Sequence, residues 1–289
     1  MISIDIVNKI KNLEIHTKKM VGGLLIGQGR SVAKGSGLEF DQIRDYQVGD
    51  DIRSIDWKSS ARMNKMLVKQ YREDKSQTVL VLVDISQSSW YGTSSMDKYE
   101  VISRIASIIS LICSYRDDAV GLILFSETVE HYVPPMKGRK HIHAVLKTLF
   151  EAQAINKKTN ICTALDYVAQ LKKKNMIVFM LSDFIDNGFE KSLSLVARQH
   201  DVIAVSCLDK CENEMPALGF LTIQDQESGE TLMLDLSRSG HSKIEGFLKK
   251  RVNDQHMIFK QLGVDSLTLS PQHDNDQELI KFFRKRMMY

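Results

Sequence analysis

The sequence predicts an α/β protein with a doubly wound, mainly parallel sheet, and two observations support this prediction. From residue 77 onward, short apolar stretches alternate with longer amphipathic stretches. The apolar stretches, of which 78–83 is the strongest, are rich in β-branched residues and leucine, which is typical of strands buried on both faces. Strands and helices that alternate in this way form a parallel sheet covered by helices on both sides.

The expected elements follow in regular order. Strands are expected at 78–83, 120–125, 128–133, 176–181, 202–205 and 266–269. Helices are expected at 95–115, 139–151, 161–173, 188–199, 240–262 and 276–287. Two residues separate 120–125 from 128–133, which indicates a hairpin and one antiparallel edge strand. A second hairpin is expected from 220–223 and 231–234.

The first 76 residues have a different character. They carry 14 basic and 10 acidic side chains, a net charge of +4, whereas the remaining 25 basic and 26 acidic side chains give −1. Apolar residues at helical spacing predict a helix at 3–20. Glycines concentrated between Gly22 and Gly37 predict a loop or irregular strand, and they match neither the dinucleotide-binding nor the Walker pattern.

These features suggest a division of the chain into two parts. Residues 1–76 form an N-terminal segment with a helix, a Gly-rich loop and a network of Arg and Asp side chains. This segment lacks enough periodic apolar sequence for a core of its own, so we expect it to pack on residues 77–289.

Composition limits the class of protein. Hydrophobic residues make up 43% and charged residues 26%, which excludes a disordered chain, a collagen-like repeat and a disulfide scaffold. The net charge of +3 is too small to indicate nucleic-acid binding. The four cysteines lie mostly in apolar stretches, as reduced thiols do in a reducing compartment. No stretch approaches eighteen uncharged apolar residues, so no membrane span is expected, and we expect a cytoplasmic protein.

Oxygen-bearing side chains follow the predicted strands where a ligand site would form. Asp84, Ser86 and Ser88 alternate at the end of the central strand, Asp183 follows the strand at 176–181, and Thr159 precedes the helix at 161. Open α/β sheets bind ligands at the carboxyl ends of their strands, and carboxylate and hydroxyl oxygens suit Mg²⁺ or Mn²⁺. The alternative is that these residues only cap helices and form turns.

This set resembles the metal-ion-dependent adhesion site of von Willebrand factor A domains. The resemblance implies a sheet of von Willebrand factor A type. It also implies that Ser86 and Ser88 bind the metal directly, that Asp84 and Asp183 act directly or through water, and that Thr159 joins in some states. In that family, an Asp or Glu of a partner commonly supplies the remaining ligand. The family's threonine often follows a glycine, whereas Lys158 precedes Thr159 here.

The N-terminal segment carries a second resemblance. Its dense motifs run through 35–40, 43–46, 49–57 and 60–62. Together with Ser182-Asp183-Phe184 and the closing 278–286 region, they resemble the bacterial domain-of-unknown-function family fifty-eight. Genes of that family commonly neighbour those of MoxR-type AAA+ ATPases. The resemblance therefore implies a MoxR-type AAA+ ATPase as a partner, with other von Willebrand factor A-like proteins as further candidates.

The segment from Arg44 to Arg62 allows two interpretations. Its mixed charges favour a paired network that holds a loop in place. It could also be a docking surface anchored by an aromatic side chain. The candidate partner-binding residues are Arg44, Tyr46, Asp50, Arg53, Asp56 and Trp57.

Taken together, these observations favour a metal-dependent protein–protein interaction module, acting as an adaptor or co-chaperone, over an enzyme. One alternative is a binder of an anionic polymer or membrane surface through the basic N-terminal region and the C-terminal tail with Arg284, Lys285 and Arg286. A further alternative is a metal-dependent phosphoryl hydrolase with Asp84 as nucleophile. That chemistry would need a second acid two residues on, where Ser86 stands.

Overall fold

The computed structural model describes residues 4–26, 38–73, 76–92, 97–153, 158–210, 219–224, 229–272 and 275–287. The chain divides into two compact units. The main unit combines residues 1–27 with residues 77–289, and the small unit comprises residues 28–76. Each unit is described by itself.

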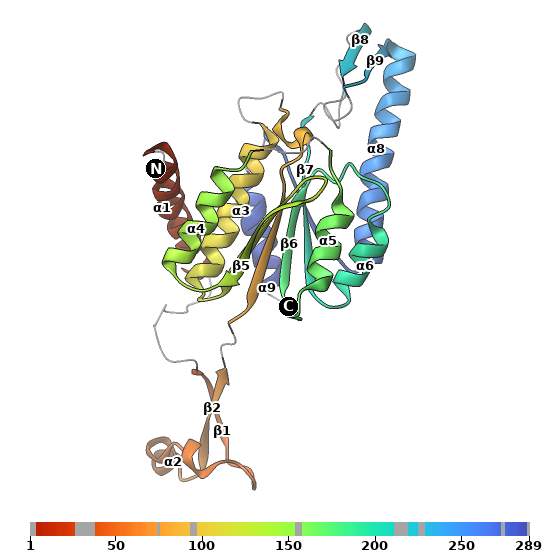
Figure 1. Cartoon of the computed structure of the whole chain (residues 1–289). Coiled ribbons are helices and arrows are strands. Elements are labelled where there is room, and N and C mark those ends of the chain that lie inside the picture. The colour runs from red at the N-terminus through yellow and green to blue at the C-terminus, as the bar shows by residue number, and fades with distance from the viewer. Residues whose placement is uncertain are drawn as a thin grey trace. The chain divides into compact units, whose positions relative to one another are not determined.

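A six-stranded sheet forms the centre of the main unit (Figure 1). Its strand order is β10-β7-β6-β3-β4-β5. The strands are β3 (Thr78–Asp84), β4 (Ala119–Phe125), β5 (Val129–Met136), β6 (Ile177–Ser182), β7 (Asp201–Cys207) and β10 (Asp265–Leu269). All neighbouring strands run parallel except β4 and β5. The doubly wound sheet with one antiparallel edge strand is therefore confirmed.

The edge position of β5 follows from its sequence. Pro134 and Pro135 lie within this strand, and proline has no backbone N–H to donate, so it is tolerated in an edge strand and not in a central one. Gly121 of β4 lies opposite, and a Cβ atom there would approach the ring of Pro135 to 2.8 Å. The proline ring thus fits the edge because the facing residue has no side chain.

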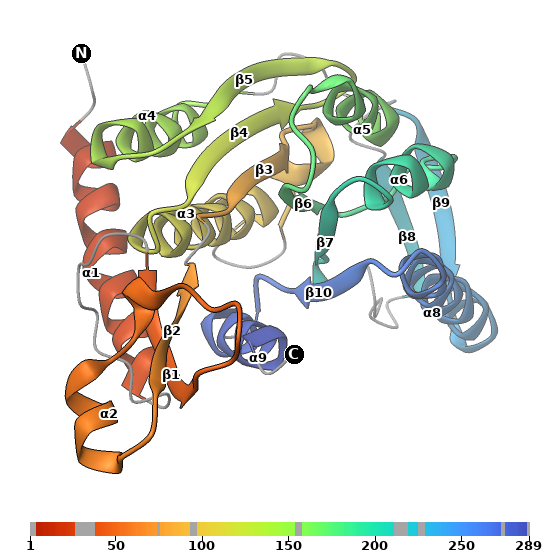
Figure 2. The same ribbon diagram turned by 90° about the horizontal axis from the view of Figure 1, so that it is seen from below.

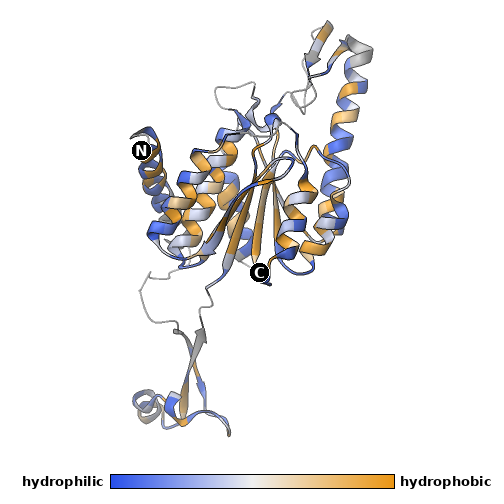
Figure 3. Cartoon of the chain, viewed as in Figure 1, coloured by the Kyte–Doolittle hydropathy of each residue, from blue (hydrophilic) through white to orange (hydrophobic). Residues whose placement is uncertain are grey.

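Two hydrophobic cores cover the faces of the sheet, and β3 contributes to both. Val79, Val81 and Val83 pack with α3 (Lys98–Tyr115), α4 (Arg139–Phe150) and α9 (Asn275–Met287). Leu80 and Leu82 pack on the opposite face with α5 (Ile161–Gln170), α6 (Glu190–Ala197) and Phe259. Successive side chains of a strand point to opposite faces, so an entirely apolar strand is the one that fills both cores. Figure 3 shows the apolar strands between helices with mixed surfaces.

The first helix, α1 (Ile4–Ile26), belongs to the main unit. Ile10 and Met20 are part of the core on the α3 side, and Glu14 pairs with Arg139 and His143 of α4. Figure 2 shows α1 beside α3 and α4. We expected residues 1–76 to form one segment, whereas the structure places residues 1–27 in the main unit and only residues 28–76 in the small unit. Helix α1 joins residues 77–289, because its apolar face completes their core.

A second hairpin and a long helix extend the main unit. Strands β8 (Gly219–Gln224) and β9 (Thr231–Leu236) pair antiparallel, as expected, and α8 (Arg238–Gln261) follows directly. Helix α8 connects the hairpin to the sheet, where Phe259 is buried (Figure 1). No helix in the described part of the chain combines the length and the apolar character that crossing a bilayer requires.

The small unit contains structure that the sequence did not predict. Strands β1 (Leu38–Asp45) and β2 (Leu67–Glu73) form an antiparallel pair, with a 3-10 helix at Ile52–Ser54 and α2 (Trp57–Met63) between them. The expected loop also begins later than proposed, since Gly22 and Gly23 lie within α1. The remaining glycine-rich residues, 27–37, lie outside the described residues.

Candidate metal centre

The site forms where the two central strands end. Asp84 is the last residue of β3 and is 0% exposed. Its Oδ1 accepts a hydrogen bond from the Ser86 backbone N–H (2.9 Å), and its Oδ2 accepts one from the Ser182 hydroxyl (2.7 Å). Ser182 ends the neighbouring parallel strand β6, so the pairing of the strands fixes the orientation of the carboxylate. Both oxygens therefore face neutral donors.

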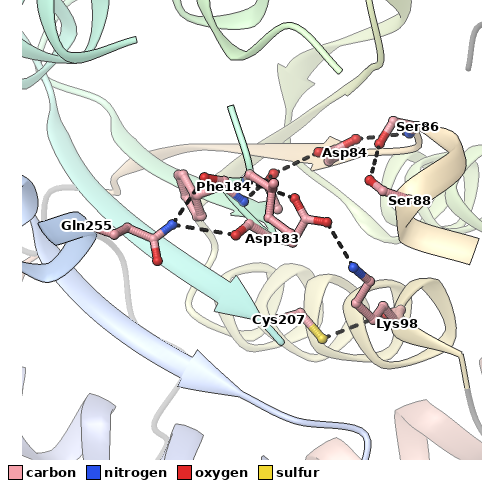
Figure 4. Close-up of polar contacts among 10 residues, drawn as sticks. Asp84, Ser86, Ser88, Lys98, Asp183, Phe184, Cys207 and Gln255 are labelled. Carbon is pink, nitrogen blue, oxygen red and sulfur yellow. Dashed lines mark hydrogen bonds and ion pairs between the residues drawn. The ribbon is translucent and has the colours of Figure 1, made fainter. Parts of the chain in front are cut away.

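Two serine hydroxyls meet beside this carboxylate. Ser86 and Ser88 lie at the start of the 3-10 helix Gln87–Trp90, whose tight turn brings alternate side chains together. Their Oγ atoms are 3.0 Å apart (Figure 4). Ser86 is buried and Ser88 is half-buried, so the pair has one side open to solvent. The structure thus brings Asp84, Ser86 and Ser88 together, as the sequence predicted.

A buried lysine binds the second predicted carboxylate. Lys98 Nζ lies 2.8 Å from Asp183 Oδ2, and the side chains are only 1% and 2% exposed. The other oxygen of Asp183 accepts the Ile185 backbone N–H at 3.1 Å. Figure 4 shows Lys98 reaching from α3 toward Asp183, which lies beside Asp84. Asp183 is therefore near the site, but its charge is already paired with that of Lys98.

Sequence reasoning missed Lys98, although a signal existed. Lys98 is the first residue of α3, directly after the capping residue Asp97. A cation in the first turn opposes the helix dipole, which favours anions there. Such a residue needs a compensating carboxylate nearby, and Asp183 supplies it.

Asp84 is the carboxylate of the site whose pKa is raised by its surroundings. Burial, together with repulsion from Asp183, raises the pKa of Asp84 to about 7. Within the described residues, no lysine, arginine or histidine forms an ion pair with Asp84. A buried carboxylate without a counter-charge is costly, and a cation would remove that cost.

The remaining predicted ligand, Thr159, lies between α4 and α5. It is half-buried, and the next residue, Asn160, caps α5 through the Thr163 backbone N–H. The Asn160 N–H also donates to the carbonyl of Ser126, which follows β4. This bond holds the segment with Thr159 at the carboxyl end of β4, which is the strand next to β3.

The residues present fit a hard divalent cation. Among the described residues, no three His, Cys, Asp or Glu side chains form a metal-binding group, so a cation here depends on hydroxyl oxygens. Asp84, Ser86 and Ser88 offer one carboxylate and two hydroxyls, which suit Mg²⁺ or Mn²⁺. Asp183 fits less well as a direct ligand, because Lys98 and a backbone N–H occupy its oxygens.

The Arg and Asp network of the small unit mainly holds that unit together. Arg44 forms two hydrogen bonds with Asp50, each 2.7 Å long, and these bonds lower the pKa of Asp50. Asp56 caps α2. The Tyr46 backbone N–H bonds to the carbonyl of Met66. These contacts give Arg44, Asp50 and Asp56 local structural roles.

Two candidate partner-binding residues remain available at the surface of the small unit. Trp57 is 63% exposed, and Arg53 is exposed. The buried apolar side chains described in this unit are only Ile55, Leu67 and Val68.

The C-terminal tail is engaged by the main unit. Arg286 pairs with Asp201 and Asp265, and Phe282 and Phe283 pack against the core on the α3 side. These contacts account for Arg286, Phe282 and Phe283 by ion pairing and packing, whereas Arg284 and Lys285 are exposed.

The fold and the site define a doubly wound α/β protein with a cluster of oxygen donors at the carboxyl ends of its central strands. The chain matches the family described as "Protein of unknown function DUF58" over residues 42–251 and belongs to that family. It is 25% identical to the uncharacterized proteins Rv1480 of Mycobacterium tuberculosis and Mb1516 of Mycobacterium bovis, over 96% of this chain and 88% of each relative.

Solved structures with a similar arrangement were also found. BatB from Bacteroides thetaiotaomicron is 13% identical, with a TM-score of 0.47 over 74% of this chain and 100% of that one. An aerotolerance-related membrane protein from Bacteroides fragilis is 15% identical, with a TM-score of 0.46 over 73% of this chain and 98% of that one. The fold described here rests on the strand order of the chain itself.

Proposed function

We propose that this chain is a protein-binding module whose contact with its partner depends on Mg²⁺ or Mn²⁺ held by Asp84, Ser86 and Ser88. The observation that carries the proposal is the buried carboxylate of Asp84, which faces only neutral donors beside two converging hydroxyls. In such a site the metal would offer a Lewis-acidic position to an oxygen ligand from another protein.

The chain's own residues have distinct tasks in this proposal. Ser182 holds Asp84 in one orientation through a hydrogen bond from the neighbouring strand. Ser86 and Ser88 supply neutral oxygens, so the site carries little negative charge and favours an additional anionic ligand. A carboxylate on the partner's surface has the required charge and the required oxygen atoms.

The class of partner is proposed from the resemblance of the sequence to von Willebrand factor A domains and to a family whose genes commonly neighbour those of MoxR-type AAA+ ATPases. We propose a MoxR-type AAA+ ATPase as the main partner and other von Willebrand factor A-like proteins as further partners. The chain would then act as an adaptor in ATP-driven assembly or remodelling of other proteins. The exposed Trp57 of the small unit offers a second contact point for such a partner.

Binding accounts for the site better than hydrolysis does. A phosphoryl hydrolase that used Asp84 as nucleophile would need a general acid nearby, but Ser86 stands at that position. Asp183 cannot take this role while Lys98 holds it. We therefore propose that the chain is not an enzyme.

Two measurements test the proposal. Titration calorimetry with Mg²⁺ should show binding to the wild type and none to Asp84→Asn, because the variant lacks the charge that attracts the cation. Asp254→Asn, which removes an exposed carboxylate on α8, serves as the matched control and should bind like the wild type. Equal binding by wild type and Asp84→Asn would refute the site.

The second measurement concerns the partner. Affinity purification from the source cell should recover an AAA+ ATPase with the wild type, and should lose it with chelator or with Asp84→Asn. Recovery that neither treatment changes would show that the interface lies elsewhere, with the exposed residues of the small unit as the next candidates.

A further inference from the structure

Helix α8 carries a concentrated positive charge. Its 24 residues include six basic and two acidic side chains, a net charge of +4, although the whole chain carries only +3. One of the two acids, Glu245, is already paired with Lys249. In the described part of the chain, Lys243, Lys250 and Arg251 form no ion pair. The helix therefore presents positive charge that no carboxylate of the described residues compensates.

A stripe of exposed side chains runs along this helix. Its members are three or four residues apart and so share one face, namely Lys243, Phe247, Lys250, Asp254 and Met257. All five are exposed, and Phe247 is 67% and Met257 57% exposed. By contrast, Leu248 and Phe259 of the same helix are buried, so these two side chains fix α8 against the rest of the main unit. An aromatic side chain is thus held at the surface between two lysines.

The helix is attached beside the candidate metal centre. Gln255 Nε2 donates long hydrogen bonds to the carbonyl oxygens of Asp183 (3.5 Å) and Phe184 (3.4 Å) (Figure 4). The ring of Phe259 meets that of Phe184 edge-on, with centroids 5.1 Å apart. Phe247 precedes Gln255 by eight residues, which is about 12 Å along the helix. An interface of about 800 Å² per partner is wider than this, so one protein can contact both the metal and the stripe.

We propose that the exposed stripe of α8 is a second docking surface, which takes an acidic segment of a partner protein with an apolar side chain at its centre. Phe247 anchors the apolar side chain, and Lys243 and Lys250 pair with carboxylates on either side of it. The metal site also takes a carboxylate, so both surfaces select the same chemistry in a partner. The inference rests on the proposed function for the identity of that partner, and it extends the interface beyond the metal.

The stripe suits an acidic protein better than a bilayer or a second copy of the chain. A helix that lies on a bilayer buries a whole apolar face in the lipid, but the buried Leu248 and Phe259 show that this face of α8 is already covered. A twofold contact between copies would place the same patch against itself, and therefore lysine against lysine.

Fluorescence anisotropy with the full chain tests this surface. Chelator is present throughout, so that no carboxylate bound to a metal contributes. The probe is a labelled peptide in which a leucine–phenylalanine pair is flanked by glutamates, and the comparison peptide has lysines in place of the glutamates. The wild type should bind the acidic peptide and not the basic one, because only the acidic peptide complements the charge of α8.

Variants locate the binding on the helix. Lys243→Glu/Lys250→Glu should weaken binding of the acidic peptide on the order of tenfold or more, since two attractive pairs become repulsive. Phe247→Ser should also weaken it, through loss of the apolar anchor. The matched control Lys172→Glu/Lys174→Glu makes the same change in net charge on exposed lysines between α5 and β6, and should bind like the wild type. All substituted side chains are exposed, so the variants should unfold at the wild-type temperature.

The outcomes are distinguishable. Failure of the acidic peptide to bind, equal binding of both peptides, or equal weakening by the control would overturn the docking surface on α8. Binding to vesicles of phosphatidylcholine and phosphatidylglycerol, or self-association in sedimentation, that Phe247→Ser abolishes would assign the stripe to lipid or to a second copy and would equally overturn it. Mg²⁺ binding in calorimetry should be unchanged in Lys243→Glu/Lys250→Glu. Absence of Mg²⁺ binding in the wild type would refute the proposed metal-dependent function without changing the peptide result.

Discussion

Replacing Asp84 with asparagine should stabilise the metal-free fold, and the gain should grow with pH. Burial, together with repulsion from Asp183, raises the pKa of Asp84 from 3.8 to about 7. Between these values the folded protein holds a proton that the unfolded chain releases, so stability falls as pH rises through this window. Below the pKa that Asp84 has in the unfolded chain, the folded and unfolded states are equally protonated. Above the pKa that it has in the folded protein, the full cost of burying the charged carboxylate is present.

The magnitude follows from the size of the shift. A difference of about three pKa units corresponds to roughly 4 kcal/mol, since each unit is worth about 1.4 kcal/mol. Asparagine keeps a similar shape and carries no charge, so the variant avoids this cost. Of this cost, roughly 3 kcal/mol develops between about pH 5 and the folded-state pKa of Asp84.

Urea denaturation in the presence of chelator measures this effect. The free energy of unfolding of Asp84→Asn relative to wild type should be about 3 kcal/mol more favourable at about pH 8 than at about pH 5. Asp254→Asn should show no such change, because Asp254 is exposed. Adding Mg²⁺ at the higher pH should stabilise the wild type and not Asp84→Asn. A pH-independent difference between wild type and Asp84→Asn would refute the reasoning about a buried, uncompensated charge.

Three further predictions follow from the structure. Ser86→Ala combined with Ser88→Ala should abolish Mg²⁺ binding in calorimetry while thermal unfolding stays close to wild type; retained binding would exclude the hydroxyls as ligands. Gly121→Ala should destabilise the fold by about 1–3 kcal/mol in urea, because the added methyl group would overlap the ring of Pro135 on the edge strand; an unchanged midpoint would contradict this packing. Deleting residues 1–26 should lower stability by more than about 2 kcal/mol, since buried apolar surface of the α3 side would become exposed; unchanged unfolding would show that α1 adds nothing to this core.

The sheet was predictable because its strands are buried on both faces. Such strands are continuous apolar runs, so no alternation has to be recognised, and β3 was placed within one residue of its observed end. The helices between them were equally clear, since parallel strands require crossovers.

The small unit was harder to predict because its strand pattern is interrupted. In β1, Leu38 and Phe40 are two residues apart, but Ile43 breaks the alternation. The structure shows a register shift between Phe40 and Gln42, which moves the following residues to the opposite face. A bulge of this kind conceals a strand from any analysis based on period-two patterns.

The candidate site was predictable only in part. Asp84, Ser86 and Ser88 are close in sequence, and strand order brings Asp183 to the same edge. The contact between Lys98 and Asp183 joins residues 85 positions apart and depends on how α3 packs against the sheet. The place of Lys98 in the first turn of α3 was a signal, but local sequence does not say which carboxylate the lysine meets, so its pairing with Asp183 was found only in the structure.

The placement of α1 has a consequence for the small unit. Because α1 precedes it and β3 follows it, residues 28–76 are an insertion whose two ends both return to the main unit. Unfolding an insertion only lengthens a closed loop of the main unit, and a doubling of loop length costs only about 0.6 kcal/mol. The small unit can therefore open and refold while the sheet stays intact, so amides of β1 and β2 should exchange with solvent through local opening, well before those of β3.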